Sequence, residues 1–216
     1  MSTISRWQFL GILFAILILP SLVYLLLITG KNRFKPLPII GEREVAANGD
    51  TIYHTIPPFR FQNQEGKFIT DTFYNGKIYV ADFFFTSCGT ICPKMSGSLQ
   101  RIQEKFKAQR DLKLASFTVD PERDSVPALK SYAKRYMVNP RKWNLLTGKK
   151  EDLYKLGVNG FLLPAQEDAL DPEGFLHSEM CVLIDKQRRI RSMRDATDPA
   201  QVDTLIDEIM VLLQEK

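Results

Sequence analysis

The sequence has little of several features that often point directly to a function. Its 216 residues contain 29 Lys and Arg against 25 Asp and Glu. The resulting net charge is too small, and the basic residues are too dispersed along the chain, to indicate nucleic-acid binding. There is no internal repeat and no low-complexity tract, which excludes repeat architectures. Cysteine and histidine are scarce, with three and two residues, so a site built from them has few members.

The chain does contain one long apolar run near its beginning. Residues 7–29 carry no charged side chain over 23 positions. At the rise of an α-helix this length is enough to cross a hydrocarbon core of about 30 Å. Trp7 stands where an aromatic anchor at the lipid–water interface is expected, and Pro20 is tolerated within a membrane-spanning helix. We therefore predict one N-terminal transmembrane helix.

A cleaved signal peptide is the main alternative for this run. Signal peptides usually have an apolar region of about 7–15 residues that ends in small residues, whereas this run is longer and ends ITGKNRF. The run also lacks the Arg-rich and Ser-rich composition of a mitochondrial transit peptide, which favours a bacterial protein. More positive charges follow the run than precede it, so the positive-inside rule alone would leave the rest of the chain in the cytoplasm.

The remainder of the chain divides into a tether and one folded domain. Residues 30–55 mix Pro, Gly and charged residues without helical or strand periodicity, as linkers do. We predict a short N-terminal tail over residues 1–6, the transmembrane anchor over 7–29, the tether over 30–55 and the folded domain over 56–216.

Within the domain, the hydrophobic pattern predicts alternating strands and helices. Residues 77–85, KIYVADFFF, have too few polar positions for an exposed face and predict a buried central strand. We expect an N-terminal hairpin over 59–70, helices over 94–110, 126–137, 151–156 and 199–214, and further strands over 112–119, 143–146, 180–185 and 188–192. This order indicates an α/β fold with a central mixed sheet flanked by helices, with parallel strands in the middle and an antiparallel hairpin at one edge.

Two of the three cysteines, Cys88 and Cys92, follow the central strand in the sequence FTSCGTICPKM. The carboxyl end of a strand is where open α/β sheets place their sites. A spacing of four places both sulfurs on one face of a helix, and a helix N-terminus favours the thiolate form that attacks disulfides and binds metals. A redox pair and a metal site both fit this arrangement. A purely structural disulfide across so short a loop would contribute little stability.

A metal site at this position needs a third ligand, because two soft ligands alone do not hold a transition metal tightly. His177 stands just before the strand predicted over 180–185, again at a strand end. We predict that Cys88, Cys92 and His177 bind the metal, whereas His54 is a solvated residue of the tether. Copper fits this ligand set best, since thiolate favours Cu(I) and imidazole also suits Cu(II).

Four other residues near these positions have expected roles. Cys181 lies within a predicted strand and is expected to be a buried, unreactive thiol. Met95 shares the helical phase of the apolar face and is expected in the core. Asp120 ends the second parallel strand at the same edge of the sheet, so it is a candidate for a group that supports the metal ligands without binding the metal. Asp124 has the spacing of a helix N-cap.

The chain resembles the SCO/SenC family of membrane-anchored, thioredoxin-like copper chaperones for cytochrome c oxidase assembly. The resemblance covers about 160 residues and rests on four segments, FTSCGTICPKM (85–95), SFTVDPERD (116–124), LHSEMCVLID (176–185) and RDATDPAQVDTLIDEI (194–209). It implies a thioredoxin-like fold in which two motif cysteines and a distant histidine bind copper, and these match Cys88, Cys92 and His177. Segment 120–124 also matches a feature of the family.

The resemblance implies a metallochaperone rather than an enzyme in the ordinary sense. Its partners would be the copper-bearing subunit of cytochrome c oxidase, a periplasmic thiol reductant and a copper donor. The domain would stand on the periplasmic side of the bacterial inner membrane, on a single-pass anchor. The alternative is a membrane-anchored thiol–disulfide oxidoreductase, in which Cys88 attacks and Cys92 resolves. A copper or redox sensor without a delivery role is a third hypothesis.

Overall fold

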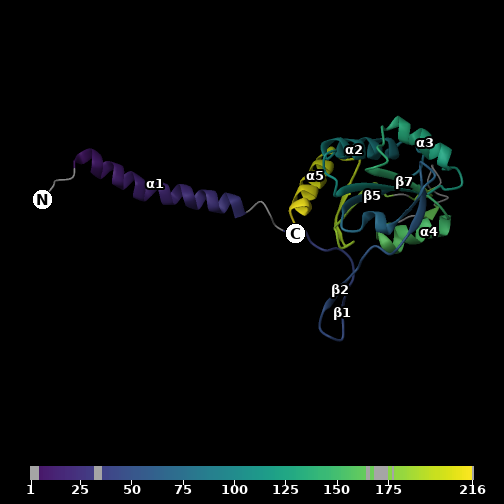
Figure 1. Ribbon diagram of the computed structural model, residues 1–216, viewed down its shortest axis with the longest axis horizontal. Helices are drawn as coiled ribbons and strands as arrows, with labels where there is room; N and C mark the ends of the chain where they lie inside the picture. The colour runs from purple at the N-terminus through teal and green to yellow at the C-terminus, as the bar shows by residue number, and fades with distance from the viewer. Residues whose placement is uncertain (1–4, 32–35, 164–165, 168–174, 177, 216) are drawn as a thin grey trace. The chain divides into compact units, whose positions relative to one another are not determined.

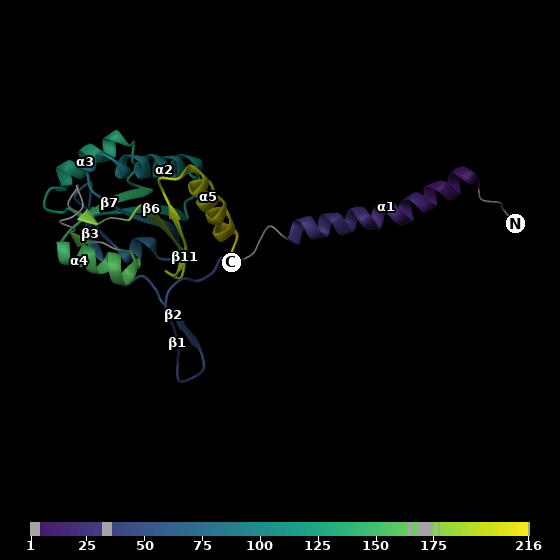
Figure 2. The same ribbon diagram turned by 180° about the vertical axis from the view of Figure 1, so that it is seen from behind.

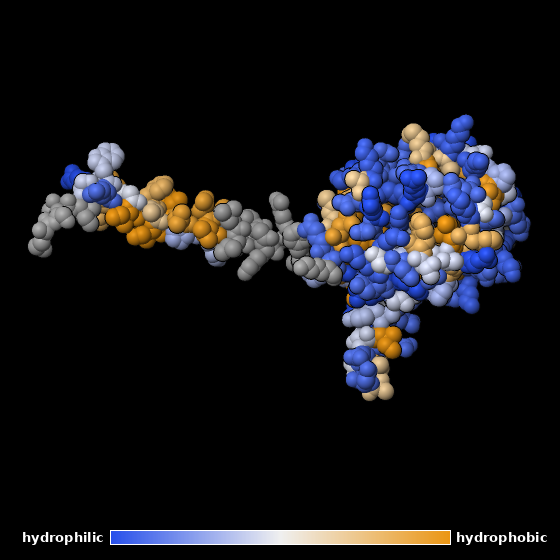
Figure 3. Space-filling view, in the orientation of Figure 1, coloured by the Kyte–Doolittle hydropathy of each residue, from blue (hydrophilic) through white to orange (hydrophobic). Residues whose placement is uncertain are grey.

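The computed structural model describes residues 5–31, 36–163, 166–167, 175–176 and 178–215. The chain divides into two compact units, Met1–Pro36 and Leu37–Lys216, and each is described by itself. The first unit is one helix, α1, over Arg6–Lys31. None of the described side chains of α1 is buried, and apolar side chains are exposed on the coloured part of the helix (Figure 3). The predicted apolar helix is thus present, with the length and composition of a membrane span or a signal sequence.

A seven-stranded mixed sheet forms the centre of the second unit (Figure 1). Its strands stand in the order β11-β10-β5-β6-β7-β3-β4. Their bounds are β3 Arg60–Asn63, β4 Phe68–Thr70, β5 Ile78–Phe84, β6 Leu112–Thr118, β7 Trp143–Thr147, β10 Met180–Ile184 and β11 Ile190–Asp195. β5, β6 and β7 are parallel, while the remaining pairs are antiparallel. The predicted α/β fold with parallel central strands is confirmed, but a hairpin closes both edges of the sheet rather than one.

Helices cover both faces of this sheet (Figures 1 and 2). Successive residues of a strand point to opposite faces of the sheet. The neighbouring residues Phe83 and Phe84 of β5 therefore show which helices cover each face. The ring of Phe84 lies 5.1 Å from that of Tyr132 in α3, while the ring of Phe83 lies 5.7 Å from that of Phe161, just after η2. The helices and turns are α2 Ile91–Lys105, α3 Val126–Arg135 and α5 Pro199–Gln214 on the Phe84 side, with α4 Lys150–Lys155 and the π-helical turn η2 Leu156–Gly160 on the Phe83 side.

The segment predicted as a tether contains structure of its own. Strands β1 (Arg43–Val45) and β2 (Thr51–Tyr53) pair as an antiparallel hairpin that projects from the body of the domain (Figures 1 and 2). The strands are too short for their alternation to be recognised in the sequence. The remaining short elements are the 3-10 turn η1 at Asp71–Tyr74 and the two-residue strands β8 Gln166–Glu167 and β9 Phe175–Leu176, which pair with each other.

Candidate metal and redox site

The two motif cysteines lie where the central strand passes into a helix. All seven residues of β5 are buried, and the chain then turns through a loop into α2. α2 begins at Ile91, three residues earlier than the sequence predicts, so Cys92 and Pro93 both lie in its first turn. Pro93 is compatible with this place because the first turn of a helix needs no backbone N–H donors. Cys88 therefore stands in the loop and Cys92 on the helix.

Cys88 and Cys92 contact each other directly. The backbone N–H of Cys92 donates a hydrogen bond to Sγ of Cys88 over 3.3 Å. Both thiols are free, and 6% of Cys88 and none of Cys92 is exposed. Sγ of Cys88 also lies 3.9 Å from the hydroxyl oxygen of Thr90. The Cys88 sulfur therefore lies against the first turn of α2, and the binding of a metal by both cysteines stays a prediction.

The electrostatic environment of Cys92 differs from the one expected at a helix N-terminus. Burial raises the pKa of the Cys92 thiol well above its usual range. The neighbouring Cys88 side chain and the charge of Asp82 act in the same direction, and a backbone hydrogen bond at Phe85 opposes them only in part. The loss of water around the thiolate disfavours the charged form more than the helix N-terminus favours it. Cys92 is thus a neutral thiol at neutral pH, and it must release a proton to bind a metal.

Asp124 holds the cysteine loop in place. Its carboxylate accepts hydrogen bonds from the backbone N–H of Thr86, at 3.1 Å, and from the hydroxyl groups of Thr86 and Thr118. Burial raises the pKa of Asp124, and these hydrogen bonds limit the rise. The predicted role of Asp124 as a helix N-cap is wrong, because Ser125 occupies that position. The spacing in the sequence is that of an N-cap residue. It does not show that the hydroxyl groups of Thr86 and Thr118 bind the carboxylate instead.

Asp120 is buried at the carboxyl end of β6, as its position in the sequence predicts. Among the described residues its Oδ2 atom accepts no hydrogen bond, and an Arg123 guanidinium nitrogen lies 3.5 Å away. A buried carboxylate oxygen beside an exposed arginine retains the capacity to accept a further hydrogen bond.

His177, the third predicted ligand, lies outside the described residues. Within the described part of the chain no group of three His, Cys, Asp or Glu side chains has the spacing of a metal site. The two thiols supply two of the sulfur ligands that a soft metal ion takes, because both are free and lie next to each other at the end of a strand. Copper(I) and zinc are the ions that such sulfur ligands select.

Two of the remaining predictions are confirmed and one is wrong. Cys181 and Met95 are fully buried, as expected of core residues. His54 is not a solvated linker residue: its Nε2 lies 2.8 Å from the carbonyl oxygen of Gly160. The ring also packs against Gly41, where any Cβ would lie 2.7 Å from that of His54. His54 therefore connects the start of the domain to the end of η2.

The buried carboxyl group of Asp82, close to Cys92, is not among the residues predicted from the sequence. Asp82 is the only charged residue of β5, and Ser116 of β6 donates a hydrogen bond to it. The indole N–H of Trp143 in turn donates to the Ser116 hydroxyl at 2.8 Å. Burial raises the pKa of Asp82 to about 7. The signal in the sequence is a single acidic residue within KIYVADFFF, at a position where an apolar residue is expected.

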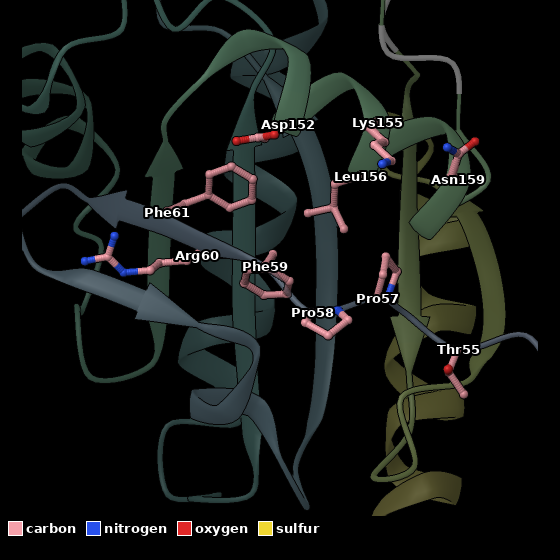
Figure 4. Close-up of a pocket in the computed structure, with 10 residues that line it drawn as sticks. All are labelled: Thr55, Pro57, Pro58, Phe59, Arg60, Phe61, Asp152, Lys155, Leu156 and Asn159. Atoms are coloured by element: carbon pink, nitrogen blue, oxygen red, sulfur yellow. The ribbon is translucent and has the colours of Figure 1, made fainter.

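A cleft of about 530 Å³ lies elsewhere on the domain, between the segment before β3 and the α4–η2 region (Figure 4). Apolar side chains, including Phe59, Phe61 and Leu156, line it together with the charged Arg60, Asp152 and Lys155. None of its ten lining residues is cysteine or histidine. The cleft is therefore separate from the cysteine pair and offers no soft metal ligand.

Comparison with known proteins identifies relatives of most of the second unit. Residues 48–214 match the sequence profile of the family described as SCO1/SenC. The SCO1 protein homolog of Bacillus subtilis is 30% identical over 165 residues, which cover 74% of this chain and 83% of the relative.

Two solved structures show the same fold. BsSco, a member of the Sco family of cytochrome c oxidase assembly proteins with a disulfide switch, is 28% identical with a TM-score of 0.65, over 76% of this chain and 95% of its own. Arabidopsis thaliana ScoI, solved with copper bound, is 25% identical with a TM-score of 0.59, over 71% of this chain and 97% of its own. The expected thioredoxin-like architecture is confirmed by these neighbours.

Proposed function

Because the chain belongs to the SCO1/SenC family, we propose that it is a copper chaperone in which Cys88, Cys92 and His177 bind one copper ion. The contact between two free thiols, with the Cys92 N–H donating to Cys88 Sγ at 3.3 Å, carries this proposal. A Cys₂His set with an open position would let a ligand of the acceptor enter before the protein's own ligands leave. Copper is then cargo rather than a permanent cofactor.

The proposed acceptor is the copper-bearing subunit of cytochrome c oxidase. Support comes from BsSco, which belongs to a family of cytochrome c oxidase assembly proteins, and from the copper bound to the Arabidopsis relative. A thiol reductant and a copper donor on the same side of the membrane complete the proposed partners, because disulfides persist in an oxidising compartment and both thiols must be reduced to take the metal. Asp120 is proposed to support the ligands by hydrogen bonding.

The proposed location follows from α1. We assign residues 7–29 to a single-pass anchor in a bacterial inner membrane, preceded by the tail 1–6, with the folded domain on the periplasmic side. The apolar helix and its exposed side chains support the anchor. The tether 30–55 and the domain 56–216 are proposed as functional divisions, although the compact unit of the structure begins at Leu37.

A second function is thiol–disulfide exchange by the same pair. The observation that favours it is the placement of Cys88 at the loop and Cys92 on the helix, since the more accessible thiol would attack and the buried one would resolve. BsSco contains a disulfide switch. Delivery of copper and preparation of acceptor cysteines both use these two sulfurs, so the functions differ only in what is transferred.

Copper titration of the reduced full chain in detergent separates the two functions. A chaperone binds one equivalent of copper, and the double variant C88S/C92S binds none, whereas C181S, a matched loss of a thiol, binds as the wild type does. An oxidoreductase binds no stoichiometric copper but cycles between thiol and disulfide against a dithiol of known potential. That second outcome would overturn the copper proposal.

A further inference from the structure

The chain enters the folded domain through a fixed contact with its C-terminal region. The Arg191 guanidinium donates hydrogen bonds to the carbonyl oxygens of Leu37, at 2.7 Å, and Pro38, at 3.1 Å. Arg191 is 4% exposed and also pairs with the carboxylates of Asp185 and Glu215. The first two residues of the second unit are thus held by a buried arginine.

This entry point lies at the end of the sheet opposite the cysteines. Ile40 bridges to Ile190, the first residue of β11. Ile184 pairs with both Ile190 and Tyr79, so this region lies level with the start of β5. Cys88 follows the other end of β5, and seven residues of strand span about 20 Å.

Basic residues gather at the same end as the entry point. The ammonium groups of Lys77 and Lys113 lie 4.8 and 5.5 Å from the centre of the Phe73 ring. Lys113 also donates to the carbonyl oxygen of Arg141 at 2.7 Å. Burial and the charge of Lys77 lower the pKa of Lys113, and burial and the charge of Lys113 lower the pKa of Lys142 to about 8. The positive groups here are close enough to repel one another.

The basic residues of this surface have no ion-paired carboxylate among the described residues. We define the basic end as Lys77, Lys107, Arg110, Lys113 and Arg141; among the described residues none of these five forms an ion pair with a carboxylate. Three acids of the region are already paired, Asp71 with Arg188, and Asp185 and Glu215 with Arg191. Glu104 and Asp111 are exposed, and the charge of Asp111 acts on Lys113 against that of Lys77. Glu42, Glu44 and Asp50, in and beside the projecting β1–β2 hairpin, are exposed as well. The five basic residues are far apart in the sequence, and the fold brings them together at one end of the domain.

We propose that the basic end of the domain binds the surface of an anionic lipid bilayer and so holds the cysteine loop away from the membrane. The inference rests on the proposed anchor but not on copper binding. Only residues 32–36 separate the end of α1 from Leu37, so the chain allows roughly 20 Å between Lys31 and Leu37. Leu37 is fixed at the basic end by Arg191. An acceptor would then meet the cysteines from the aqueous side.

The proposal predicts a lipid-dependent protection of particular lysines. The full chain is placed in nanodiscs of phosphatidylcholine alone or with about 30% phosphatidylglycerol. Acetylation rates of single lysines by a neutral reagent are then measured by mass spectrometry. Lys77, Lys107 and Lys113 should react several-fold more slowly in the anionic discs, while the exposed Lys94 and Lys149, which lie at the cysteine end, should react equally in both. High salt, about 0.5 M, should remove the difference.

A pair of variants with equal loss of charge tests the cause. Each basic residue near an anionic leaflet is worth roughly a five-fold change in binding. The variant R110Q/R141Q should therefore lose the protection of Lys77 and Lys107, and K130Q/K149Q should retain it. The proposal is overturned if all lysines respond alike to the lipid, or if both variants behave as the wild type. If the chain does not stay in the disc, the proposed membrane anchor is wrong, and this inference is wrong with it. The proposal of copper binding is tested by a separate measurement and does not depend on this result.

Discussion

The carboxylate of Asp124 lies 3.1 Å from the backbone nitrogen of Thr86, two residues before Cys88. The same carboxylate binds the hydroxyl of Thr118 at the end of β6. One buried side chain thus joins the cysteine loop to the neighbouring strand. The geometry of the site depends on this link because the loop itself contains Gly89, which restricts the backbone little.

Replacing Asp124 with Asn should therefore weaken both stability and copper binding. The amide presents one acceptor oxygen where three donors converge, so a buried donor loses its partner. The free energy of unfolding should fall by about 1–3 kcal/mol, and copper affinity should fall with it. Asp198→Asn is the control, because Asp198 accepts a hydrogen bond from Ala200 at the start of α5, remote in sequence from the loop. Equal copper affinity in both variants would show that Asp124 has only a structural role.

Copper affinity should rise with pH. Because burial raises the pKa of Cys92, this thiol keeps its proton in the metal-free protein at neutral pH and releases it when copper binds. Each proton released adds about one logarithmic unit of affinity per pH unit. Competition titrations between pH 6 and 8 measure this slope, and Cys92→Ser should reduce it. An affinity that is independent of pH would contradict a protonated Cys92.

The stability of the reduced, metal-free protein should decrease as pH rises from about 4 to about 7. Asp82 has a folded-state pKa of about 7 against an ordinary value of 3.8, so in this range the folded state holds a proton that the unfolded state has lost. The free energy of unfolding falls by up to about 4 kcal/mol across this window, and above it the titration of Asp82 causes no further change with pH.

The variant Asp82→Asn should remove this dependence and be the more stable protein at pH 8. Its amide oxygen still accepts from Ser116, so the hydrogen bond is kept. Denaturant unfolding at pH 5 and pH 8 gives the comparison, and the fluorescence of Trp143, which donates to Ser116, reports on the region. If the wild type and the variant lose the same stability between the two pH values, Asp82 does not titrate as described.

Cys181→Ala should leave copper binding unchanged and lower stability slightly. Cys181 is fully buried, and burial raises its pKa far above the usual range, so it is an inert thiol. Removing one sulfur from the core costs about 1 kcal/mol. Stoichiometry of copper and thermal unfolding are the two measurements. A loss of copper binding in this variant would assign Cys181 to the site.

The sequence predicts those parts of the fold that depend on local pattern. The buried strand β5 and the helix α5 are evident from an unbroken apolar run and from apolar residues at helical spacing. The start of α2 is not, because Pro93 is compatible with both the loop and the first turn of the helix. The cysteine pair is visible from its spacing alone.

Properties set by packing between distant segments cannot be read from that pattern. The pKa of Cys92 depends on the burial of its side chain in the folded domain, whereas a helix N-terminus alone predicts the opposite direction. The partners of Asp124 come from two other segments of the chain. His54 contacts Gly160, more than one hundred residues away, although its neighbours in the sequence indicate a linker.

The variant His177→Ala, in the reduced full chain, shows whether Cys88, Cys92 and His177 together bind one copper ion. Copper is titrated while absorption and EPR spectra are recorded, with His54→Ala as the control because it removes the other histidine of the chain. We expect one equivalent of copper in the wild type and in the control, and weaker binding with an altered thiolate-to-Cu(II) charge-transfer band in His177→Ala. Wild-type affinity and spectra in His177→Ala would contradict it.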